Sequence, residues 1–147
     1  MQALDEADAL AQSRSLAWNE ATIDAAEALA WRADDVSPKT LKALARGDYR
    51  IDAEIDLHRL RVGHAERELR AFIAEARKQG AACVRVVHGK GLRAAAGGSV
   101  LKALVDRMLR QRDDVLAFAS TPEAMGGTGA VLVLLAKRRP GERGPAG

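Results

Sequence analysis

Four side chains that can support acid–base chemistry follow two short apolar runs of the sequence. Asp56 and His58 end the first run, and His88 and Lys90 follow the second. Residues two apart on a strand project from the same side, so Asp56 can orient the His58 imidazole and set its tautomer. Cleavage of a phosphodiester needs a base, an acid and positive charge near the phosphorus, and these residue types can supply all three. We therefore interpret Asp56, His58 and His88 as candidate catalytic residues.

Glycines surround the lysine and recur before the last apolar run. Gly89 and Gly91 flank Lys90, and such residues allow positive φ angles and close approach of a ligand. A lysine among exposed backbone N–H groups is suited to phosphate, so this loop is a candidate substrate-binding loop. The cluster Gly127, Thr128 and Gly129 could also admit a nucleic-acid backbone. The structural alternative is an ordinary turn with a solvent-facing lysine, and histidines that only satisfy a strand edge.

Alternating and helical hydrophobic patterns predict the elements that hold these residues. Strands are expected near 53–58, 83–88, 115–119 and 130–136, and amphipathic helices over 62–79 and 100–111. The outer face of the first helix should show Arg67, Arg70 and Arg77. The order β-α-β-α-β-β predicts an α/β two-layer sandwich. It has a four-stranded mixed sheet with both helices on one face, the first three strands parallel and the fourth antiparallel. The candidate residues then share one sheet edge.

The remaining sequence suggests an arm, one domain and a tail. Residues 1–50 carry 6 basic and 9 acidic side chains, a net charge of −3, and include a capped helix near 38–46. Residues 51–139 carry 16 basic and 10 acidic side chains, a net charge of +6, and form the expected domain. Residues 140–147 are an expected disordered tail. Trp18 and Trp31 should dock part of the arm onto this aromatic-poor domain.

Composition limits the expected cellular compartment and the expected kinds of partner. The single cysteine, Cys83, excludes an intramolecular disulfide, and no apolar run approaches the ~20 residues of a membrane span. A cytoplasmic protein without a membrane partner is therefore expected. The basic domain favours a nucleic acid as partner.

Three segments resemble the Smr domain, the small MutS-related nuclease domain: residues 55–58, 88–91 and 127–130. The resemblance runs from about Arg50 to Lys137, and the residues before it are similar to the stand-alone bacterial type usually called SmrA. It implies endonuclease activity and a fold similar to the C-terminal domain of translation initiation factor three. It also implies catalytic roles for Asp56 and His58, and substrate or catalytic roles for His88 and Lys90.

Two positions depart from the family pattern. Arg59 stands where the first motif usually continues with glycine, and its charge is a candidate contact to the substrate backbone. Met108 replaces a common tryptophan at a core-facing position, a change in packing.

The function expected from the sequence is an endonuclease with little sequence preference. DNA nicking is placed first because the SmrA-like form is usually described as a DNA nickase, and a divalent metal such as Mg²⁺ would help to activate water for it. RNA supplies its own 2′-hydroxyl nucleophile, so an endonuclease acting on ribosome-associated mRNA is the alternative. A nucleic-acid-binding module without activity is the third reading. The expected partners are DNA or RNA, with the ribosome as a further candidate. The resident cofactor is left unassigned.

Overall fold

The computed structural model describes residues 21–90 and 98–137. The long elements are the helices α2 (Pro38–Arg46), α3 (Val62–Lys78) and α4 (Val100–Arg110), and the strands β3 (Ala53–Asp56), β4 (Cys83–Val87), β6 (Val115–Ser120) and β7 (Ala130–Leu135). Shorter elements are the strands β1 (Ile23–Asp24), β2 (Ala30–Arg32) and β5 (Gly98–Ser99), and two 3₁₀ turns, η2 (Glu123–Met125) and η3 (Gly127–Gly129). None of the described helices combines the length and apolar character needed to cross a membrane.

The main sheet has the strand order β2-β6-β7-β4-β3. β3 runs parallel to β4, and β7 is antiparallel to both β4 and β6, so the predicted strand directions are confirmed. The predicted number of strands was wrong, because β2 adds a fifth strand antiparallel to β6. This strand has three residues, too few for an alternating pattern to reveal it. Its Trp31 ring stacks on Phe118 with ring centroids 5.6 Å apart, which docks the arm as predicted for one of the two tryptophans. Trp18 lies outside the described residues.

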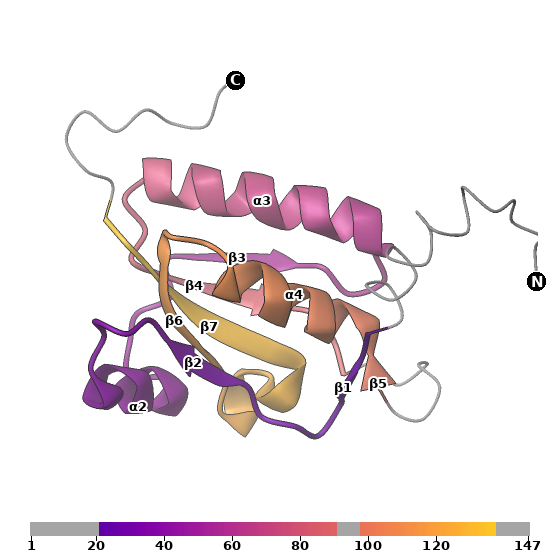
Figure 1. Ribbon diagram of the computed structural model, residues 1–147, viewed down its shortest axis with the longest axis horizontal. Helices are drawn as coiled ribbons and strands as arrows, with labels where there is room; N and C mark the ends of the chain where they lie inside the picture. The colour runs from indigo at the N-terminus through magenta and orange to yellow at the C-terminus, as the bar shows by residue number, and fades with distance from the viewer. Residues whose placement is uncertain (1–20, 91–97, 138–147) are drawn as a thin grey trace, which may run out of the picture.

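Helices α3 and α4 cover one face of the sheet, as the crossover rule predicts (Figure 1). The core between them is aliphatic and includes Leu69, Ile73, Val105 and Leu109. Helix α2 packs on the other face through the fully buried Leu44, against β6 and β7 (Figure 1). The predicted two layers thus gain a partial third. All six residues of β7 are buried, as expected for a strand covered on both faces.

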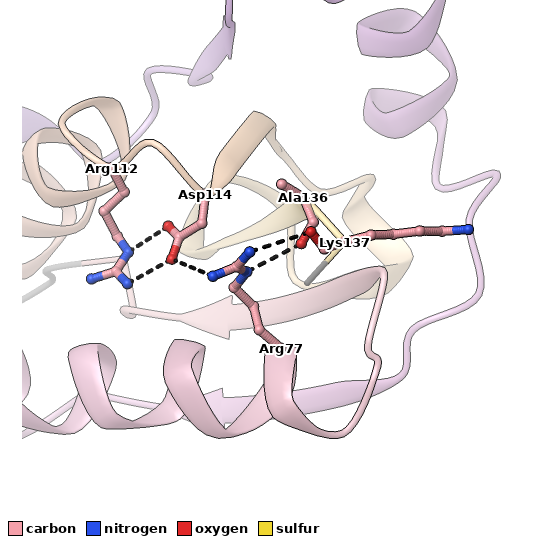
Figure 2. Close-up of polar contacts among 5 residues, drawn as sticks. All are labelled: Arg77, Arg112, Asp114, Ala136 and Lys137. Atoms are coloured by element: carbon pink, nitrogen blue, oxygen red, sulfur yellow. Dashed lines mark hydrogen bonds and ion pairs between the residues drawn. The ribbon is translucent and has the colours of Figure 1, made fainter. Parts of the chain in front are cut away.

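An arginine cluster joins elements at the end of the sheet where β6 begins and β7 ends. Arg77 donates to Asp114, 3.5 Å away, and to the carbonyl oxygens of Ala136 and Lys137, and Arg112 donates two hydrogen bonds of 2.8 Å to Asp114 (Figure 2). The Arg77 side chain is only 14% exposed, so its predicted place on the outer face was wrong. The periodicity places Arg77 at the margin of the buried stripe, where a long side chain can fold back over the sheet end.

Candidate active site at the ends of β3 and β4

A carboxylate and an imidazole form a pair where β3 ends. The Nδ1–H of His58 donates to Oδ1 of Asp56 across 2.5 Å, and the His58 backbone N–H donates to the same oxygen across 3.0 Å. Leu57 between them is fully buried, and its N–H bonds the Val87 carbonyl oxygen at 2.7 Å. Alternation along the strand therefore sends Leu57 into the core and leaves Asp56 and His58 about half exposed, at 50% and 45%.

The electrostatics of the pair fix its protonation pattern. Partial burial by itself would raise the pKa of Asp56, but the hydrogen bonds from the His58 ring and backbone and the charges of His58 and Arg85 outweigh it, so the pKa is lowered. An ionised Asp56 can only accept, so Nδ1 of His58 carries the proton. The Nε2 atom of His58 is then the ring nitrogen that can take a proton from a bound molecule.

His88 lies just beyond β4 and is enclosed by the fold. Its side chain is 2% exposed, Nδ1–H donates to the Gly89 carbonyl oxygen at 2.8 Å, and Nε2 is buried with no hydrogen-bond partner. Burial lowers the pKa of His88 to about 4, helped by the charge of Lys102 and opposed by the Gly89 bond. The ring is therefore neutral at physiological pH, with a bare nitrogen at Nε2.

Glycines bring the three sequence motifs together. Gly89 has φ +83°, and a Cβ there would stand 3.1 Å from the His58 Cβ. The Gly129 carbonyl oxygen accepts from the N–H groups of both His88 and Gly89 at 3.0 Å. A Cβ on Gly129 would stand 3.1 Å from Cγ of Lys90, whose side chain is exposed. The predicted common edge thus contains the pair at β3, the loop after β4 and the turn before β7.

In the two glycine-containing segments, the remaining predicted substrate-binding residues are Gly127, Thr128 and Gly91. Gly127 is buried with φ +57°, and its carbonyl oxygen accepts from the Thr121 hydroxyl at 3.0 Å, so it shapes the turn. Thr128 beside it is half-buried. Gly91 lies outside the described residues, and its substrate-binding role stays a prediction.

The Smr domain family model matches residues 55–136, more than half of the chain. The chain belongs to the Smr domain family. A solved structure of YdaL, described as a stand-alone small MutS-related protein from Escherichia coli, superimposes with a TM-score of 0.68 at 30% identity over 78% of this chain and 88% of YdaL. The Smr domain of Thermus thermophilus MutS2 gives a TM-score of 0.50 at 35% identity, covering 60% of this chain and 99% of that domain.

Curated relatives carry a name that refers to the ribosome. The protein from Aliivibrio fischeri named ribosome rescue factor SmrB is 41% identical over 102 residues, which is 69% of this chain and 54% of the relative. The SmrB of Vibrio vulnificus is 43% identical with the same coverage. The chain thus spans about half the length of the curated relatives it matches.

Positive charge borders the exposed pair of this Smr domain. The side chains of Arg59, Arg61 and Lys90 are exposed and have no ion-pair partner in the part of the chain that the structure describes. Arg59 has φ +75°, a left-handed conformation that glycine adopts more readily than residues with a Cβ. Arg61 precedes α3 as its N-cap residue and was missed by sequence reasoning, because it belongs to no motif.

A second residue missed by sequence reasoning is Lys102. It occupies the first turn of α4 with no exposed surface, and its charge acts on His88. A lysine in an amphipathic helix is normally assigned to solvent, so only its place between core positions could have signalled burial.

No group of three or more metal-ligating side chains occurs among residues 21–90 and 98–137.

Proposed function

We propose that this Smr domain is an endonuclease that cleaves ribosome-associated mRNA with little sequence preference. The observation that carries the proposal is the Asp56–His58 pair, half exposed and joined at 2.5 Å. An imidazole oriented by an ionised carboxylate is a general base, and general bases contribute roughly 10²–10⁴-fold to rate. The names of the SmrB relatives support the ribosomal setting over the DNA nicking that the sequence placed first.

RNA is a suitable substrate for a site with one exposed general base, because the ribose 2′-hydroxyl of RNA is itself the nucleophile. Nε2 of His58 takes the proton of a ribose 2′-hydroxyl, the 2′ oxygen bonds to phosphorus, and the bond from phosphorus to the 5′ oxygen breaks. The leaving oxygen takes a proton from solvent, giving a 2′,3′-cyclic phosphate and a 5′-hydroxyl end. The positive charges of Lys90 and Arg59 stabilise the extra negative charge on the phosphoryl oxygens.

The exposed basic residues near the pair favour contact with the sugar–phosphate backbone over contact with the bases. Arginine and lysine side chains bind phosphate, and phosphate contacts carry no sequence information; the residues meant are Arg59, Arg61 and Lys90. Ribosomal RNA could also meet these charges, so ribosomes are the proposed partner and the cytoplasm the proposed location.

The test compares one sequence made as RNA and as DNA, each with and without a chelator. The wild type should cut the RNA and leave cyclic phosphate ends, and His58→Ala should lose about 10²-fold or more of kcat. His64→Ala is the matched control, because His64 is an exposed histidine that pairs with Glu68 on α3, and its activity should match the wild type.

Two outcomes would sink the proposal. One is equal cleavage by folded His58→Ala, which removes the pair from the chemistry. The other is DNA cut as fast as RNA, since the 2′-hydroxyl would then have no role. Sedimentation of the wild-type protein with ribosomes tests the partner separately.

A further inference from the structure

The first turn of α4 carries a fully buried ammonium group. The Lys102 side chain has no exposed surface, and its Nζ donates to the carbonyl oxygens of Asp24 at 3.0 Å, Ala25 at 3.2 Å and Glu27. Three donors thus meet three acceptors, the condition under which burial of a charge is tolerated. Burial lowers the pKa of Lys102, and the carboxylates of Glu27 and Asp24 oppose that shift.

Lys102 holds a segment of the arm, residues 23–29, which we call the strap. At one end of the strap, β1 pairs with β5 through Ile23 opposite Ser99. At the other end, the Leu29 N–H donates to the Ser120 hydroxyl oxygen at 2.8 Å and its carbonyl oxygen accepts from the Ser120 N–H. Between these ends, Lys102 supplies the hydrogen bonds that the structure describes from the strap to the rest of the fold.

The strap lies at the functional end of the sheet. β1, β5 and the start of α4 occupy the same end as the end of β3 (Figure 1). Ser99 both pairs with β1 and caps α4, its Oγ accepting from the Lys102 N–H at 3.0 Å. The strap and the start of α4 are therefore joined through Lys102, and the charge of this side chain also acts on His88.

We propose that Lys102 is a positioning residue of the active site, which acts through the strap carbonyls to fix the start of α4 at the end of the sheet that carries the candidate site. The inference rests on the proposed RNA cleavage for its kinetic consequence. The fastening of the strap can be measured without any activity. Errors of about 1 Å in a catalytic arrangement can cost up to ~10²-fold in rate, so loosening this support should lower kcat.

Two variants separate the charge of Lys102 from its volume. Lys102→Met keeps most of the hydrocarbon stem, and Lys102→Ala leaves space for a small amine. Both should lose about tenfold or more in kcat with KM within about twofold, because Arg59 and Lys90 still contact the phosphates.

A small amine added in solution tests whether the ammonium group itself is needed. Propylammonium chloride should restore the kcat of Lys102→Ala in a saturable way and leave the kcat of Lys102→Met unchanged. Tetramethylammonium chloride at equal ionic strength lacks N–H donors and should restore neither. Lys42→Ala, on the exposed side of α2, is the matched control and should behave as the wild type.

Hydrogen exchange supplies the readout that is independent of activity. In Lys102→Met the amides of Ala26 and Glu27 should exchange faster, while the amides of β6 and β7 keep their protection. Unchanged exchange in the strap, or full kcat in both folded variants, would overturn the inference. Loss of fold in both variants would also overturn it, because Lys102 would then be needed for global stability. Failure of the wild type to cut RNA refutes the proposed function alone, and the exchange data still decide whether Lys102 fastens the strap.

Discussion

At the scale of single residues, Arg59 shows a conflict between charge and backbone conformation. Its φ of +75° lies in the left-handed region, which costs an L-residue with a Cβ roughly 1–2 kcal/mol. Glycine adopts this conformation without that cost, because it has no Cβ. This chain keeps an exposed guanidinium beside the Asp56–His58 pair, and the strain is the cost of that charge.

Arg59→Gly should therefore raise the free energy of unfolding by about 0.5–1 kcal/mol. It removes the backbone strain, and the greater conformational entropy of glycine in the unfolded chain offsets part of that gain. Urea denaturation measures the change. Arg59→Ala is the control, since it removes the charge and keeps the Cβ, and it should leave stability within ~0.5 kcal/mol. An equal gain in both variants would assign the effect to charge and contradict the strain argument.

His88 should make stability depend on pH. The pKa of His88 falls from the ordinary 6.5 to about 4 in the folded state. Between these two pH values the imidazole is protonated in the unfolded chain and neutral in the folded protein. Stability should consequently fall as the pH drops from 6.5 toward 4, by up to about 3 kcal/mol. Denaturation curves of wild type and His88→Gln across this range check it. The difference between the two unfolding free energies should become smaller as the pH falls. Parallel profiles would show that the burial of His88 does not make stability depend on pH.

The geometry of the candidate site was predictable where it depends on residues close together in the sequence. Alternation alone placed Asp56 and His58 on one side of their strand. The same alternation puts His88 on the side of Val84 and Val86, both buried, and this was a signal that the histidine turns inward. The Gly129 carbonyl oxygen that accepts from the His88 N–H is distant in sequence, and so is the Lys102 charge that acts on the ring, so no local pattern could predict these surroundings.

At the scale of elements, long periodic segments were predictable and short ones were not. The Ser37 side chain accepts from the Thr40 N–H at 3.2 Å and Gly47 ends α2 with φ +79°, as the cap residues indicate. β2 has three residues and β1 and β5 have two each, so their pairing partners, and not their own patterns, decide their conformation. In the arginine cluster of Figure 2, Arg77 of α3 likewise binds the segments that precede β6 and follow β7, although periodicity assigns its side chain to solvent.

Arg77→Ala should lower the free energy of unfolding by about 2 kcal/mol, because it leaves Asp114 and two carbonyl oxygens with fewer donors in a largely buried place. Arg70→Ala on the same helix is the control. Arg70 forms an exposed pair with Glu66 at 3.1 Å, which contributes less than ~0.5 kcal/mol. Thermal unfolding of both variants measures the contrast. Equal effects would mean that the cluster contributes no more than a surface pair.

At the scale of the whole molecule, the acidic arm and the basic domain meet through specific contacts. The sequence places a boundary at residue 50, and the described elements before it pack onto the sheet from two sides. β2 extends the sheet beside β6, and α2 covers its second face. Composition reveals the change of charge at this boundary, but it cannot show that the carbonyl oxygens of the arm satisfy a buried lysine of α4.

A chain that begins at residue 36 should therefore be less stable than one that begins at residue 21. The shorter chain loses the stacking of Trp31 on Phe118, leaves the Lys102 ammonium without its three acceptors and exposes the edge of β6. We expect a loss of at least about 3 kcal/mol in unfolding free energy and a tendency to associate through the open edge. Urea denaturation and size-exclusion chromatography of the two chains provide the measurement. If both chains prove equally stable and monomeric, the residues between 21 and 35 contribute nothing to the fold, and Lys102 must find other acceptors within it.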